Sequence, residues 1–270
     1  MSIIKGDLHF HSTHSACKMG HQTGQLIDYH KGCGIGAVKE MIKVGNIAYK
    51  LGYQYIAITN HTQFPTATKP ASFEDAHKLL EHHFQISKLN RKHNPKGIKL
   101  MSGVETNIIN ATGQVGLSDD VLKQLDVVIA SNHRPTRRLS KNNIKNGFLG
   151  VVKNKHVDII GHLTRFITKL SDSDWQDIIN ACEQYNKIIE YNINYPLYQS
   201  VLKMVARSRL LIAFGTDTHP EMIDRPIRQH ITNDIKHAEI AIKYLEGFGI
   251  NKNRIINTYS WPRVKKILVN

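Results

Sequence analysis

One pattern repeats along this chain and limits the folds it can adopt: a short apolar run ending in polar residues, followed by a stretch with helical periodicity. The apolar runs occupy residues 3–11, 55–61, 98–107, 126–133, 157–163, 188–194 and 210–219. Their centres, such as YIAI and DVVIA, are continuous apolar segments, which is typical of parallel strands buried on both faces. Seven such units in series predict an α/β fold whose strands form a parallel barrel.

The segments between these runs predict helices. We expect them at residues 37–53, 72–93, 143–155, 171–187 and 196–209, with a last helix at 237–249. Ser171 followed by Asp174 resembles the capping box that begins many helices, and Ser72 followed by Asp75 has the same form. The histidines of the second helical stretch are expected to face solvent: His77, His82, His83 and His93.

Length and composition favour a single cytoplasmic domain spanning residues 1–270. A chain of 270 residues with 41% hydrophobic and 21% charged residues can bury a sizeable core. No run of 18 apolar residues and no signal peptide is visible, so we expect neither a membrane span nor export. The three cysteines, Cys17, Cys33 and Cys182, are too few for a disulfide framework and favour a reducing compartment.

The formal net charge of +14 suggests an anionic partner. That partner could be a nucleic acid, a phosphorylated small molecule or a membrane surface. Lysine and arginine occur throughout the chain and form no dense tail. The charge could therefore equally be spread over solvated faces without a specific partner.

Histidines and carboxylates gather where the predicted strands end. In a parallel barrel these ends meet on one face, where the chemistry of such barrels takes place. Six of the seven strand ends contribute candidate metal ligands: His9, His11, His61, Glu105, His133, His162, Asp217 and His219. Imidazole and carboxylate ligands suit Zn, Mn or Fe. Eight ligands are too many for one ion and favour two or three divalent ions bridged by a carboxylate, a cluster that can activate water and hold a phosphoryl oxygen.

The order and spacing of these residues form a set of motifs that covers nearly the whole chain. The motifs are HFH at 9–11, TNH at 59–61, GVE at 103–105, SNH at 131–133, GH at 161–162 and DTH at 217–219. This set resembles the polymerase and histidinol phosphatase (PHP) family of metal-dependent phosphoesterases. The resemblance implies a distorted (β/α)7 barrel with a di- or trinuclear metal site at the carboxyl ends of the strands.

The resemblance also implies a division of the ligands among the ions. A first ion would be held by four residues: His9, His11, Glu105 and Asp217. Glu105, as a bridge, would hold a second ion with His133 and His162. His61 and His219 would help to hold a third.

Four residues are candidates for direct roles in the reaction. Glu105 and Asp217 are the catalytic candidates, and either Asp217 or a water could carry a proton. Arg134 directly follows a predicted ligand, and Arg165 lies three residues after another. Both arginines are therefore expected to bind the phosphate of a substrate.

The chain departs from the family pattern at two positions that concern the metal site. Asn60 stands where the second motif usually has Asp, and we expect Asn60 to orient a ligand from outside the cluster. Cys17 stands where many members have a further histidine. Cys17, His14 or His21 could complete the third metal site, or that site could be weak or empty.

The substrate class remains divided at this point. The leading expectation is a small phosphomonoester, as for histidinol phosphatase, and the alternative is a nuclease that trims DNA 3′ ends. A non-catalytic metal-binding barrel is a third possibility, which Asn60 and Cys17 would favour. Amidohydrolase barrels also begin with H-x-H, but they usually bridge their metals through a lysine after a middle strand, and the sequence has none there.

Overall fold

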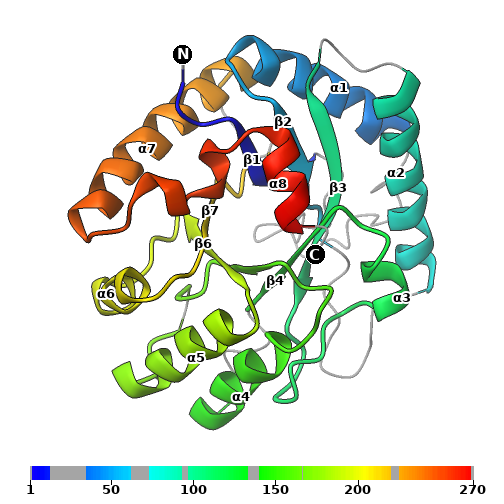
Figure 1. The fold of residues 1–270 in the computed structure, drawn as a ribbon. Helices are drawn as coiled ribbons and strands as arrows, with labels where there is room; N and C mark the ends of the chain where they lie inside the picture. Colours follow the sequence, from blue (N-terminus) through cyan, green and yellow to red (C-terminus); the bar gives the residue numbers. More distant parts are fainter. Residues whose placement is uncertain are drawn as a thin grey trace.

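The computed structural model describes residues 2–12, 35–61, 73–92, 97–132, 140–165, 167–219 and 225–268. Seven parallel strands stand side by side in chain order. They are β1 (Gly6–Phe10), β2 (Tyr55–Ile58), β3 (Lys99–Asn107), β4 (Val127–Ser131), β5 (Ile159–Gly161), β6 (Ile188–Asn192) and β7 (Ile212–Gly215). β7 returns to β1 through a parallel bridge between Phe10 and Thr218, and His11 N donates to Thr218 O over 2.9 Å. The strands therefore form a nearly closed, distorted (β/α)7 barrel, as predicted (Figure 1).

Helices surround the strands (Figure 1). They are α1 (Ile35–Lys50), α2 (Phe73–Lys92), α3 (Asp119–Leu122), α4 (Lys141–Val151), α5 (Asp172–Gln184), α6 (Gln199–Arg207), α7 (Ile227–Gly247) and α8 (Trp261–Leu268), with short 3-10 turns η4 (Lys252–Arg254) and η5 (Ile256–Thr258). The capping box of α5 is confirmed, because Ser171 N donates to Asp174 Oδ2 over 2.8 Å while Ser171 Oγ accepts from Asp174 N. Ser72 lies outside the described residues. Within the described ranges, no helix is long and apolar enough to cross a membrane.

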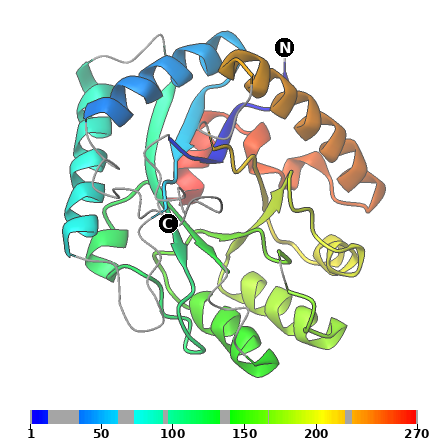
Figure 2. The ribbon, with the colours of Figure 1, turned by 180° about the vertical axis from the view of Figure 1, so that it is seen from behind.

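The end of the chain differs from the prediction of a last helix at residues 237–249. α7 already begins at Ile227, directly after Pro226, and α8 follows it. α8 lies across one end of the barrel in Figure 1 and behind the strands in Figure 2. Val264 and Leu268 of α8 pack with residues that point into the barrel, such as Leu8 and Ile188. Trp261 N donates to Gln54 Oε1, just before β2, so α8 closes the amino-terminal end and leaves the carboxyl ends of the strands open to other residues.

The histidines of α2 do not all face solvent, so that prediction is wrong for two of them. His82 is fully buried, and the His83 ring nitrogen Nδ1 lies 2.5 Å from Ser102 Oγ of β3. The helix is held against the same strand by Asn90, whose side chain bonds both the N–H and the C=O of Leu100. Polar residues of α2 thus pair with residues of β3, and the helical periodicity of α2 could not reveal these contacts. The side chain of His77 and the whole of His93 lie outside the described residues.

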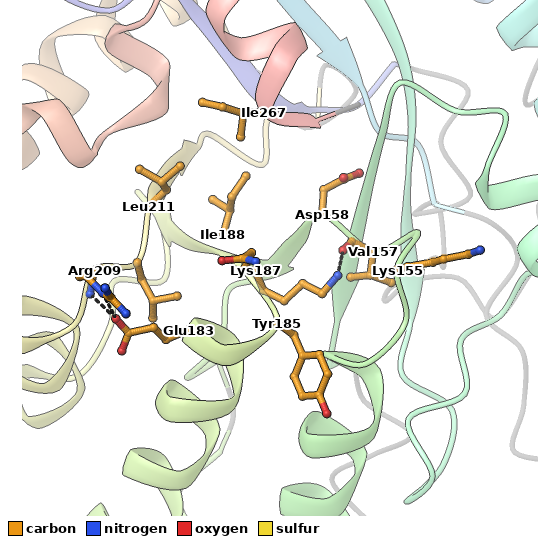
Figure 3. Close-up of a pocket in the computed structure, with 12 residues that line it drawn as sticks. Lys155, Val157, Asp158, Glu183, Tyr185, Lys187, Ile188, Arg209, Leu211 and Ile267 are labelled. Carbon is orange, nitrogen blue, oxygen red and sulfur yellow. Dashed lines mark hydrogen bonds and ion pairs between the residues drawn. The ribbon is translucent and has the colours of Figure 1, made fainter. Parts of the chain in front are cut away.

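A cavity of about 650 Å³ lies beside the starts of β5, β6 and β7, at the end of the barrel that α8 covers (Figure 3). The Lys187 ammonium donates to Val157 O over 2.6 Å and to Asn154 O over 2.8 Å. Asp158 accepts from Val128 N over 2.8 Å. Burial raises the pKa of Asp158 to about 7, and burial lowers the pKa of Lys187.

Replacing Asp158 by Asn should flatten the pH dependence of stability. The folded pKa of Asp158, about 7, lies above the unfolded value of about 3.9. The folded state therefore holds this proton more tightly, and the free energy of unfolding decreases as the pH rises from about 4 to 7. Urea denaturation of metal-free protein gives the free energy of unfolding at pH 5 and at pH 8. The decrease of this free energy from pH 5 to pH 8 should be about 2 kcal/mol smaller in Asp158→Asn than in wild type. The exposed Asp120→Asn protein is the control; equal pH dependence in wild type and Asp158→Asn would contradict the assignment.

Candidate metal centre

Four of the predicted ligands converge at the carboxyl ends of β1, β3 and β7. The ligand atoms of His9, His11, Glu105 and Asp217 all lie within 4.8 Å of one another, and all four side chains are buried. The Nε2 atoms of His9 and His11 are 3.1 Å apart because residues i and i+2 of an extended chain share a face. His11 Nε2 lies 3.3 Å from Asp217 Oδ1 and 3.4 Å from Glu105 Oε2.

A second group shares His11 with the first. Its members are His11, His61 and His219, whose ligand atoms also lie within 4.8 Å of one another. The rings of His11 and His219 are stacked, with centroids 4.1 Å apart. His219 Nδ1 lies 2.8 Å from the carbonyl oxygen of Asp217, which fixes the orientation of that ring.

Glu105 lies between the groups. Its Oε1 is 2.7 Å from His162 Nε2, while its Oε2 is 3.2 Å from His9 Nε2 and 3.1 Å from His61 Nδ1. The side chain is fully buried in the second half of β3. A carboxylate that reaches imidazoles on both sides has the geometry of a bridging ligand.

Two residues of the cluster have left-handed backbone conformations. His162 has φ of 24° and Asp217 has φ of 50°. Such values are uncommon for residues other than glycine and cost about 1–3 kcal/mol each, so they persist where the surrounding structure imposes them. His162 directly follows β5, and Asp217 lies two residues after the end of β7. The bend at each position brings the side chain into the cluster.

The cluster concentrates opposite charges in a buried space. Burial alone would lower the pKa of His9, but the carboxylates of Glu190, Glu105 and Asp217 together raise it well above its usual value. Burial opposes ionisation of Asp217, yet His9 and His11 hold the pKa of Asp217 well below its usual range. Burial and the neighbouring His11 lower the pKa of His219 to about 4, so this imidazole is neutral at pH 7.

This donor set fits divalent metal ions. Imidazole nitrogens and carboxylate oxygens are the ligands that Zn, Mn and Fe accept. The Nε2 atoms of His9 and His11 face each other and two carboxylate oxygens across a gap of 3.1–3.6 Å. One cation at this position would replace the protons that these histidines otherwise need to balance Glu105 and Asp217.

Some predicted site residues fall outside the described part of the chain. These are the metal candidate His133, the phosphate-binding candidate Arg134, and the candidates for the third site, His14, Cys17 and His21. Arg165 is described, and one of its guanidinium nitrogens lies 3.5 Å from Asp217 Oδ2.

Asn60 holds Ser12, the residue after His11, through two hydrogen bonds. Its Oδ1 accepts from Ser12 N over 2.8 Å, and its Nδ2 donates to Ser12 Oγ over 2.8 Å. Using both an acceptor and a donor, Asn60 fixes the chain directly after β1.

Sequence reasoning missed two carboxylates beside His9. Asp7 accepts from His9 N over 3.0 Å and from Thr216 Oγ1 over 2.6 Å, and burial raises the pKa of Asp7 to about 6. Glu190 on β6 lies 2.5 Å from His9 Nδ1. Both residues are charged positions inside runs that otherwise resemble buried strands, GDLHF and IIEYN. A charged residue inside a buried strand was the sequence signal that could have identified these two carboxylates.

Comparison with known proteins relates the chain to phosphatases. It is 30% identical over 216 residues to a protein named "Probable phosphatase" of Thermoanaerobacter sp. (strain X514), which covers 78% of this chain and 80% of that relative. It is 31% identical over 272 residues to the DNA polymerase/3'-5' exonuclease PolX of Bacillus subtilis (strain 168). That match covers 98% of this chain but 41% of PolX. No protein-family model matches the chain.

A solved structure supports the fold. Histidinol phosphate phosphatase from Lactococcus lactis subsp. lactis Il1403, in complex with zinc, L-histidinol and phosphate, superposes with a TM-score of 0.50. The match covers 89% of this chain and 93% of that one at 20% sequence identity. Together with the barrel and its buried His/Glu/Asp cluster, these relationships identify a hydrolase of phosphate esters, and the chain belongs to the polymerase and histidinol phosphatase (PHP) family.

Proposed function

We propose that this protein hydrolyses small phosphomonoesters with two or three divalent ions bound at the carboxyl ends of the strands. The observation that supports this most is the approach of His9, His11, Glu105 and Asp217 to within 4.8 Å in a buried space. The chain is 30% identical to a "Probable phosphatase" over 80% of the length of that relative, and this similarity supports a substrate that is a small phosphate ester. Histidinol phosphate is one substrate to test, since the structural neighbour was solved with L-histidinol and phosphate.

The proposal assigns the candidate ligands to separate ions. His9, His11, Glu105 and Asp217 would hold the first. Glu105 would bridge to a second ion held by His162, together with His133. His61 and His219 would contribute to a third, close to His11.

The ions, when bound, would supply Lewis-acid stabilisation of phosphate oxygens and activate a water at neutral pH. The chain itself would supply orientation and proton transfer. Glu105 is fully buried, so its carboxylate can hold a fixed position between the two groups of imidazoles. The neighbouring histidines hold the pKa of Asp217 low, so its carboxylate is ionised and would orient a water that carries a proton to the leaving oxygen of the substrate.

Arg165 would bind the substrate phosphate at the edge of the cluster. Its guanidinium stacks on the ring of Tyr195 at 3.9 Å and donates to Tyr195 Oη over 3.1 Å. The same group lies 3.5 Å from Asp217 Oδ2 and is 19% exposed, so it borders both the cluster and the solvent. A guanidinium held in this way suits recognition of a phosphate.

A second candidate is a nuclease acting on DNA 3′ ends. It is favoured by the net charge of +14 and by the match of 98% of this chain to part of PolX, whose name includes a 3'-5' exonuclease. Binding of this kind would weaken steeply with salt, because neutralised phosphates release counterions.

One experiment separates the two candidates. Protein reconstituted with Mn or Zn is incubated with small phosphomonoesters, including histidinol phosphate, and separately with end-labelled single-stranded DNA. We expect the esters to be hydrolysed and the Arg165→Gln protein to show a KM raised at least about 10-fold, since a hydrogen bond to a charged group contributes about 1.5–3 kcal/mol. Arg209→Gln is the matched control, because this arginine is 94% exposed and far from the cluster. Stepwise shortening of the DNA would favour the nuclease, and turnover of neither substrate would reject both.

A further inference from the structure

A charged side chain lies in the interior of β6, the one strand without a predicted metal ligand. Along β6, Ile188 packs inside the barrel, whereas Ile189 and Tyr191 pack against the surrounding helices. Because successive side chains of a strand alternate, Glu190 points into the barrel. It is 1% exposed, and an ionised carboxylate at such a depth is retained only where it has strong partners.

The partners of Glu190 are two of the candidate ligands. Its Oε1 lies 2.5 Å from His9 Nδ1. Its Oε2 accepts from the backbone N–H of His162 over 2.5 Å. Residues of β1 and of the end of β5, far apart in the chain, are thus joined by one carboxylate from β6.

The neighbouring strand makes room for this carboxylate. A Cβ atom at Gly215 of β7 would overlap with the carboxylate of Glu190 and would lie 3.0 Å from His9 Cβ. The φ of Gly215 is not in the left-handed region, so its backbone conformation does not require glycine. Glycine is required here because it lets the Glu190 carboxylate approach closely. Glycine at 215 and glutamate at 190 therefore form one arrangement behind the His9 ring.

We propose that Glu190 is a positioning residue that orients ligands of two ion sites at once, through the His9 ring and the His162 backbone. Glu190 is itself outside both groups of ligand atoms that could hold an ion. The inference rests on the proposed metal-dependent function only in so far as ions bind at this cluster.

The consequence for His9 follows from its two ring nitrogens. A proton on Nδ1 would be accepted by Glu190, and Nε2, which lies 3.1 Å from His11 Nε2 and 3.2 Å from Glu105 Oε2, would then be available to a bound cation. A carboxylate that fixes the tautomer of a ligand histidine in this way typically changes metal affinity about 10- to 100-fold when it is lost. The consequence for His162 is a fixed backbone at φ of 24°, which holds its Nε2 2.7 Å from Glu105 Oε1.

The test is direct measurement of metal binding to Glu190→Gln. This change keeps the shape of the side chain but leaves one oxygen acceptor for two N–H groups. We expect titration calorimetry with Mn²⁺ to give a Kd about 10- to 100-fold higher than that of the wild type. At saturating Mn²⁺, kcat should recover to within a few-fold, and KM should be unchanged, because the Glu190 side chain is buried and would not reach a substrate.

Asp158→Asn is the matched control. Asp158 is also a buried carboxylate that accepts a backbone N–H, that of Val128, but it lies at the opposite end of the barrel. We expect its Kd for Mn²⁺ to equal that of the wild type. A second readout is the ¹⁵N spectrum of the zinc-loaded protein, in which His9 should carry its proton on Nδ1 in the wild type and lose this defined state in Glu190→Gln.

Gly215→Ala provides an independent variant, because its methyl group should displace the Glu190 carboxylate and raise the Kd in the same way. A Kd within 2-fold of wild type in folded Glu190→Gln overturns the inference and leaves Glu190 with a structural role. A wild type that binds no divalent ion overturns both the inference and the proposed function. A wild type that binds Mn²⁺ without hydrolysing any phosphate ester rejects the proposed function alone, and the Kd comparison still decides the role of Glu190.

Discussion

Glu105→Gln is expected to lower kcat/KM for phosphate-ester hydrolysis by about 10³-fold or more while leaving the protein folded. Glu105 is the side chain that contacts imidazoles on both sides, His162 through Oε1 and His9 and His61 through Oε2. Glutamine has nearly the same volume but carries no charge, and its NH₂ group has no lone pair available to bind a metal ion. Loss of one bridging carboxylate should forfeit several kcal/mol of stabilisation, and each 1.4 kcal/mol corresponds to about tenfold in rate.

The measurement combines steady-state kinetics with the metal content of the purified protein. Both should fall in Glu105→Gln, whereas circular dichroism should be unchanged. Glu246→Gln, at an exposed position of α7, is the matched control and should behave as wild type. Full activity in Glu105→Gln would reject the assignment of this cluster as the catalytic centre.

Gly113→Ala is expected to destabilise the fold by about 3–4 kcal/mol. Gly113 has φ of 79° in the turn after β3, and a Cβ there would lie 2.6 Å from Gly150 Cα, with backbone atoms of Val151 and Gly150 closer still. A Cβ at Gly150 would likewise lie 2.8 Å from Gly113 N. The turn and α4 therefore meet backbone to backbone, and an added methyl group must push them apart.

Thermal unfolding of metal-free protein measures this effect. A loss of 3–4 kcal/mol should lower Tm by about 6–12 °C for a chain of this size. Gly249→Ala isolates the backbone contribution, because Gly249 has a similar φ of 85° and nothing within 4 Å of its Cβ position. We expect that control to lose about 1 kcal/mol. Equal losses of unfolding free energy in the two variants would show that the close packing of Gly113 on α4 does not contribute to stability.

The metal candidates were accessible to sequence reasoning because their signal is local. Each described candidate follows an apolar run, and the i, i+2 spacing of His9 and His11 alone implies a shared face. The rule that parallel strands present their carboxyl ends together then brings the candidates to one place. Glu190 was missed since its role depends on a contact with His9, 181 residues away in the chain.

The sequence by itself determined the β/α order, the barrel and the types of the candidate ligands, because apolar runs and helical periodicity act over a few residues. The tertiary structure alone decided how the candidate ligands are held. It set the left-handed bends at His162 and Asp217 and the space beside Gly215 that Glu190 fills. It also placed α8 across the amino-terminal end of the barrel. These features arise from packing between segments distant in the chain, where the free energy of burying a side chain or satisfying a buried charge outweighs local preference.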